Sequence, residues 1–350
     1  MLTFPFFFKS LIFLTVLIEC PVIPSADFRY HGNLNGCFIN VFQLPDNFYI
    51  SIFAPFKTLM KNKKVISVLV IVIAIMAIIA ASSGIFSNGG NGPYEYQSIR
   101  GKTVTIHGDG LYRHMSSDVA IQGIAQDYVT LFLAVPLLLA ALIFSNKGSL
   151  RSRFLLAGIL NYFLLTYLFY LEMAMYNEMF LAYIILTGTS FFAFVILLMT
   201  FDIQKMPVIF NSNIPVKFIG GFLIFNSIII ALLWLSVVIP PLIDGSIIPD
   251  AVEHYTTLTV QGLDMALFLP ISFVSGFLLI KKKPFGYLMS TVTLVFLPLL
   301  MTALTAKIIA MAMTGVNVIP AVFIIPAILI ISILCSQLML RNINEHYPES

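Results

Sequence analysis

The sequence predicts an all-α fold, a polytopic transmembrane helix bundle with about eight spans. Its residues are 59% apolar and only 10% charged, whereas a soluble domain is roughly 45–50% apolar and about 25% charged. Long apolar runs recur along the chain, and each has the roughly 20 residues that a helix needs to cross a hydrocarbon core. Because an open strand edge would leave backbone groups unpaired in lipid, each run is predicted to be helical.

The predicted spans follow one another from residue 65 to residue 340, separated by more polar turns. They are Val65–Phe86, Tyr128–Ser145, Phe154–Ala174, Phe180–Phe201, Phe218–Ile239, Leu258–Ile280, Tyr287–Met311 and Pro320–Leu340.

Lys and Arg occur in every second turn between these runs, and the other turns are acidic, neutral or mixed. Cytoplasmic loops retain Lys and Arg, so this alternation predicts the side that each turn faces. Lys61, Lys63 and Lys64 precede the first span, which places that end in the cytoplasm. We therefore expect a multi-pass protein of the cell membrane with both ends of residues 60–350 cytoplasmic. The basic turns are Asn146–Arg153, Asp202–Lys217, Lys281–Gly286 and the segment from Arg341 onward.

The first 59 residues fit this pattern less well. Met1–Glu19 is apolar with Lys9 in its middle, and it resembles either a signal-peptide core or an extra span. A third reading is that Met60, which precedes a basic cluster and a clean apolar run, is the biological start. We divide the chain into this extension (1–59), a first span (60–86), an extracytoplasmic segment (87–127), a seven-span bundle (128–340) and a cytoplasmic tail (341–350).

The extracytoplasmic segment contains the one predicted β-hairpin. Lys102–His107 alternates as a strand does, Gly108–Gly110 supplies a turn, and Leu111–His114 is the expected second strand. Ser116 is expected to cap a short helix that runs into the second span.

Spans two and six begin alike. Gln122–Asp127 reads Gln-Gly-Ile-Ala-Gln-Asp and Gln261–Asp264 reads Gln-Gly-Leu-Asp, and each is followed by an apolar run with a proline and then a basic turn. One interpretation is a parallel repeat of four spans plus four, an arrangement found among transporters. The alternative is chance similarity between short polar segments.

Four charged residues fall within or beside apolar runs. Glu172 and Lys307 are at similar depths of the third and seventh spans, where a pair would offset the cost of burying either charge. Alternatively, both reach the outer headgroups and are solvated there. Helical spacing puts Asn161 and Tyr176 on the face of Glu172.

Asp127 and Asp264 have two interpretations as well. A carboxylate in the first turn of a helix is favoured by the helix dipole. If it is buried, it is a proton or cation site. Together with Glu172, Lys307, Asn161 and Tyr176, these two residues are the predicted substrate or ion pathway.

The outer segments also hold candidate metal ligands, because imidazole and carboxylate groups suit divalent ions. They are His107, Asp109, His114 and His254, and their spacing matches no metal motif, so ordinary solvated loops are the alternative. No cofactor is predicted. The net charge of +3 is spread over turns, which gives no support for nucleic-acid binding.

Three functions remain open from the sequence. The first is a transporter of a small solute, coupled to an ion or a proton. The second is a non-catalytic accessory or sensory subunit with a protein partner or a second copy of the chain. The third is an outer-leaflet enzyme that uses a metal, although the chain contains no nucleophile or phosphate-loop motif. Four tyrosines enrich the third span, either for packing or as a ligand wall. They are Tyr162, Tyr167, Tyr170 and Tyr176.

Overall fold

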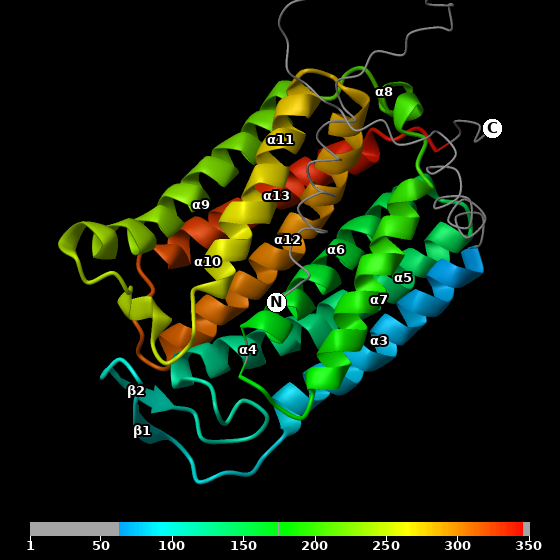
Figure 1. Ribbon diagram of the computed structural model, residues 1–350. Coiled ribbons are helices and arrows are strands. Elements are labelled where there is room, and N and C mark those ends of the chain that lie inside the picture. Colours follow the sequence, from blue (N-terminus) through cyan, green and yellow to red (C-terminus); the bar gives the residue numbers. More distant parts are fainter. Residues whose placement is uncertain (1–62, 174, 346–350) are drawn as a thin grey trace, which may run out of the picture. The chain divides into compact units, whose positions relative to one another are not determined.

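The computed structural model describes residues 63–173 and 175–345, all within one compact unit, Tyr49–Ser350 (Figure 1). In this part of the chain, 8 helices are long and apolar enough to cross a membrane, as predicted. A single two-stranded sheet accompanies them in the same residues. The predictions for residues 1–59, Met60 and Lys61 fall outside the described residues.

The observed helices agree with the predicted spans to within a few residues, except that the second begins at Ser117 instead of Tyr128. The first turns of this second span contain the polar residues Gln122, Gln126 and Asp127, so the apolar run in the sequence begins only after them. The membrane-length helices are α3 (Lys63–Phe86), α4 with η1 and α5 (Ser117–Val129, Thr130–Ala134, Val135–Asn146), α6 (Leu150–Glu172), α7 (Phe180–Met199), α9 (Val216–Asp244), α10 with η4 and α11 (Thr259–Leu263, Asp264–Phe268, Leu269–Ile280), α12 (Pro284–Met313) and α13 (Ala321–Arg341). The short α8 (Met206–Ile209) precedes α9.

The helices pack as two groups that lie side by side (Figure 1). The first group contains α3, α4–α5, α6 and α7, and the second contains α9, α10–α11, α12 and α13. The groups meet where α12 packs against α4 and α6. Gly158 makes this approach close, because a Cβ there would collide with Val295 of α12. Small residues at helix crossings allow such contact in membrane bundles.

Spans two and six share an interruption. Each contains a five-residue π-helical turn, η1 or η4, and each turn is followed by a helix with proline at its second position, Pro136 or Pro270. Proline lacks the N–H of a regular helix and clashes with the carbonyl four residues earlier, which lies inside the π turn in both spans. The wider π turn accommodates this clash without ending the span.

The outer hairpin pairs differently from the prediction. Strand β2 (Thr103–Ile106) pairs antiparallel with β1 (Tyr94–Gln97), upstream of it, so the prediction of a second strand over Leu111–His114 was wrong. Leu111, Tyr112 and Met115 are instead buried against Ala120 of α4. Burial of these side chains withdraws the segment from the sheet.

The two groups are also tied together at the end of the bundle that carries β1 and β2. The Arg100 guanidinium donates to the Tyr255 carbonyl oxygen at 2.9 Å, and Lys102 Nζ donates to the Asp250 carbonyl oxygen at 2.7 Å. The Tyr255 hydroxyl accepts from the Ser116 N–H at 3.1 Å. Thus the segment before α4 holds the loop between α9 and α10.

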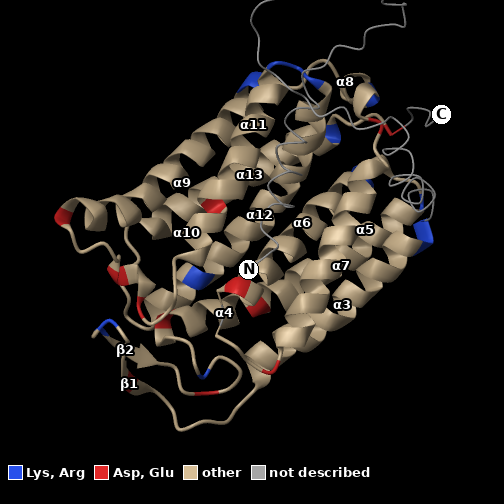
Figure 2. Ribbon diagram, in the orientation of Figure 1, with Lys and Arg blue, Asp and Glu red and all other residues tan. Residues whose placement is uncertain are grey.

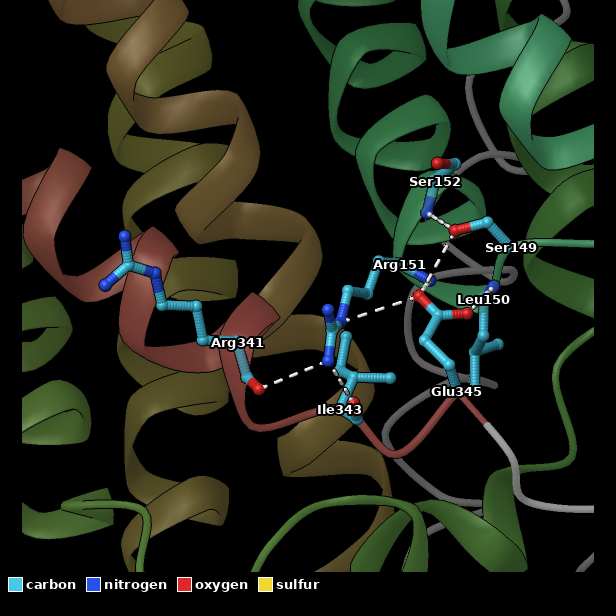
Figure 3. Close-up of polar contacts among 7 residues, drawn as sticks. All are labelled: Ser149, Leu150, Arg151, Ser152, Arg341, Ile343 and Glu345. Atoms are coloured by element: carbon cyan, nitrogen blue, oxygen red, sulfur yellow. Dashed lines mark hydrogen bonds and ion pairs between the residues drawn. The ribbon is translucent and has the colours of Figure 1, made fainter.

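A second tie lies at the opposite end, where the chain after α13 reaches the start of α6 (Figure 3). Glu345 accepts hydrogen bonds from the backbone N–H groups of Leu150 (2.9 Å) and Arg151 (3.0 Å). The Arg151 guanidinium in turn donates to the Ile343 carbonyl oxygen at 2.9 Å. A carboxylate at a helix N-terminus is favoured by the dipole and by the free N–H groups.

Candidate functional site

Asp127 is the most deeply buried carboxylate among the described residues, with 1% of its surface exposed. It lies well inside the second span, since α4 begins at Ser117 and has Asp118 in its first turn. The helix-dipole interpretation of Asp127 was therefore wrong. A carboxylate at this position costs several kcal/mol unless other groups hydrogen-bond to it.

Two tyrosines supply those hydrogen bonds. The Tyr112 hydroxyl donates to Asp127 Oδ2 at 2.5 Å, and the Tyr170 hydroxyl lies 3.1 Å from Oδ1 and 3.0 Å from the Gly123 carbonyl oxygen. Tyr112 precedes the second span, and burial, followed by the charge of Asp127, raises its pKa well above the ordinary value. Tyr112 therefore keeps its proton and remains a donor.

Helix α3 closes the third side of the carboxylate. A Cβ at Gly84 would collide with Asp127 Oδ2 and lie 2.8 Å from the Tyr112 hydroxyl oxygen. Only glycine allows the α3 backbone this close to the carboxylate. Asp127 is thus held by α3, α6 and the outer segment together.

Lys307 of α12 connects this carboxylate with the second group. Its charge interacts with those of Asp127 and Asp264, although no direct ion pair joins it to either one in the described part of the chain. Asp264 begins the π turn η4 and accepts a hydrogen bond from Trp234 Nε1 of α9 at 2.9 Å. Lys307 and Asp264 are half-buried. Three of the predicted pathway residues therefore interact electrostatically, one base with two acids.

The other predicted pathway residues lie elsewhere. Glu172, the last residue of α6, is exposed, and none of the ion pairs of the described residues joins it to Lys307. Asn161 is half-buried within α6. Tyr176 is 77% exposed, and its ring packs on Phe180 with 5.1 Å between centroids. Of these three, only Tyr176 approaches the Asp127 site, through the cavity described next.

A cavity of about 100 Å³ lies between the end of α6 and the start of α7. Tyr170, which contacts Asp127, forms part of its wall, so one side chain separates the cavity from the carboxylate. At the same edge of the bundle, Arg113 pairs with Glu178. A hydrogen bond from a backbone N–H and the Arg113 charge lower the pKa of Glu178. The lining residues are Tyr170, Leu171, Met175, Tyr176, Asn177, Phe180 and Tyr183.

The candidate metal ligands do not form a metal site in the part of the chain that the structure describes. No group of three or more His, Cys, Asp or Glu residues there lies close enough to hold an ion. His254 Nε2 is 3.1 Å from the His114 carbonyl oxygen, and Asp109 accepts from the N–H groups of Gly89 and Gly110. These residues, with His107 nearby, support the outer loops.

Several site residues were not selected from the sequence. Tyr112 stood in the predicted strand, and Gly84, Asn177 and Trp234 carry no pattern of their own. The density of tyrosine in the third span was the one usable signal, and Tyr170 fits the ligand-wall alternative. Comparisons with protein-family models, curated proteins and solved structures found no match to this chain.

Proposed function

We propose that this chain, a multi-pass membrane protein, transports a small solute and couples that transport to a proton or cation. The observation that carries the proposal is that the Lys307 charge interacts both with Asp127 of the first helix group and with Asp264 of the second. Ionisable groups inside membrane spans are costly, and they commonly mark ion and proton pathways.

The charges of this site suggest how coupling would work. Two acids and one base leave one negative charge uncompensated. A proton or cation that neutralises either carboxylate leaves the Lys307 charge attracted to the other one alone. Because Asp127 and Asp264 belong to different helix groups, this shift would favour one arrangement of the groups over another.

A parallel repeat is part of this proposal, and backbone geometry supports it. Corresponding features recur at a spacing of 134 residues, from Thr130 to Asp264 at the start of each π turn and from Leu150 to Pro284 at the start of the next helix. Between them, Gly148 (φ +95°) and Lys282 (φ +52°) occupy equivalent left-handed positions. This spacing pairs Asp264 with Thr130 and not with Asp127, so the two carboxylates are not equivalent.

The charge distribution supports the proposed orientation in a cell membrane, with residues 60–350 starting and ending in the cytoplasm. Lys and Arg gather at the end of the bundle that carries α8, and most Asp and Glu lie toward the end with β1 and β2 (Figure 2). By the positive-inside rule, the first of these ends is cytoplasmic. The cavity beside Tyr170 then opens outward.

Purified full-length protein in vesicles loaded with a pH-sensitive dye tests the function. A panel of small amines, polyols and carboxylic acids is added outside, and proton movement is recorded. We expect a response to at least one compound class, a loss of tenfold or more in Asp264→Asn and Lys307→Met, and an unchanged response in the surface control Glu95→Gln. If no class elicits a response, or if both variants respond fully, the chain is not a proton-coupled transporter.

A further inference from the structure

The cavity beside Tyr170 contains a buried hydrogen-bond donor that has no acceptor. Asn177 is only 7% exposed and lines the cavity, and its Nδ2 atom has no hydrogen-bond partner among the described residues. Its Oδ1 atom accepts from the Met179 N–H at 2.9 Å, which fixes the amide orientation. An unpaired buried donor costs roughly 1–3 kcal/mol, so the geometry favours a ligand that supplies an acceptor.

A second polar atom lies beside this amide. The Tyr183 hydroxyl is buried next to the Asn177 amide and the Tyr112 hydroxyl, and its contacts with both fall short of hydrogen-bond geometry in the described part of the chain. The Tyr170 hydroxyl is committed to Asp127 and Gly123, so Tyr170 contributes its ring to the cavity. An oxygen atom of a ligand could therefore receive hydrogen bonds from both Asn177 and Tyr183.

Aromatic rings form most of the remaining wall. Tyr170 and Tyr183 have ring centroids 5.4 Å apart, and Tyr176 and Phe180 have centroids 5.1 Å apart. Aromatic faces attract ammonium groups through their quadrupoles. The carboxylate of Asp127 behind Tyr170 adds negative potential, which disfavours an anionic ligand and favours a cation.

The size of the cavity limits the ligand further. Its volume of about 100 Å³ corresponds to roughly seven to ten water molecules at 10–15 Å³ each. A molecule with only a few non-hydrogen atoms fits such a space.

We propose that this cavity binds a small organic ammonium ion that carries one acceptor oxygen, of the amino-alcohol class. The aromatic rings hold the ammonium group, and Asn177 Nδ2 with the Tyr183 hydroxyl hold the oxygen. This inference rests on the proposed function and deepens it, because it names the class of substrate that would bind in the cavity next to Asp127.

Equilibrium calorimetry on the full-length protein in lipid nanodiscs tests the inference, with ethanolamine as the probe. Ethylammonium lacks the oxygen and ethylene glycol lacks the charge. We expect the wild type to bind ethanolamine about tenfold more tightly than either compound, the loss expected for one buried interaction. Absence of ethanolamine binding, or equal affinity for all three compounds, overturns the inference.

Asn177→Leu combined with Tyr183→Phe is the decisive variant, because it removes both proposed donors and adds no group to which the ethanolamine hydroxyl could donate. The readout is the ratio of the affinities for ethanolamine and ethylammonium, which should fall from about ten to about one. Asn146→Leu combined with Tyr128→Phe changes an exposed amide and an exposed hydroxyl and should leave the ratio unchanged. A ratio that is unchanged in the first double variant also overturns the inference.

The calorimetry does not depend on transport, so the two proposals fail separately. Ethanolamine binding without proton movement in vesicles would contradict proton-coupled transport alone. Proton movement driven by another solute class, without ethanolamine binding, would contradict the substrate class alone.

Discussion

The Asp127 carboxylate is surrounded by groups from several separate parts of the chain. Its two oxygens accept hydrogen bonds from the Tyr112 and Tyr170 hydroxyl groups, and the α3 backbone at Gly84 lies close to the carboxylate. Such a carboxylate is positioned by groups from separate parts of the chain, so removing one of them leaves a buried polar group underpaired. The cost of that loss exceeds the net contribution of an ordinary hydrogen bond.

Tyr112→Phe tests this dependence, because it keeps the ring and removes only the hydroxyl. We expect it to reduce the free energy of unfolding by about 2 kcal/mol, the range for a hydrogen bond to a charged group. Tyr128→Phe is the control, since Tyr128 follows Asp127 on α4 but is 48% exposed. Denaturant titration of both variants in the same lipid measures the difference, and equal stability of the two would contradict the role of Tyr112.

At the residue scale, the sequence identifies charges but not their partners. Asp127, Asp264 and Lys307 stand out because charge is rare in apolar runs. The pairing of Lys307 with Glu172 was a reasonable expectation from depth alone. Depth does not determine which charges interact, and the Lys307 charge interacts with Asp127 of α4 and Asp264 of η4 instead. Tyr112 and Asn177 become visible only once the helices are assembled.

At the scale of elements, apolar length predicts spans well because a bilayer requires roughly 20 helical residues and paired backbone groups. The short helix predicted after Ser116 is present as the first turns of α4, although the Ser116 side chain makes no capping hydrogen bond, and it is continuous with the second span. The strand partner of β2 was missed because burial of Leu111 and Tyr112 outweighs their strand propensity. The π turns have no sequence signature except the prolines that follow them.

The tie between the C-terminal segment and α6 is the element whose contribution is easiest to measure. In Glu345→Ala, the N–H groups of Leu150 and Arg151 lose their acceptor, so their hydrogen exchange should accelerate several-fold. Hydrogen-exchange mass spectrometry of peptides that cover the start of α6 measures this. Glu178→Ala, at the other end of the bundle, is the control. Unchanged protection in Glu345→Ala would show that the tie is not formed in the membrane.

At the scale of the whole bundle, the two helix groups are joined by one tie at each end and by the packing of α12 on α6. The tie near β1 and β2 uses Arg100, and the tie at the opposite end uses Glu345. Lys307 lies within this arrangement and interacts with a carboxylate from each group. A change of charge at either carboxylate would therefore be felt by both groups, which is the basis of the proposed coupling.

Double-mutant cycles on unfolding free energy test this central claim most directly. Lys307→Met is combined in turn with Asp127→Asn, with Asp264→Asn and with Glu172→Gln. We predict coupling energies of at least about 0.5 kcal/mol for the two Asp pairs, as expected for interacting residues, and none beyond error for Glu172. Coupling to Glu172 alone, or to neither Asp residue, would contradict a lysine shared between the two helix groups.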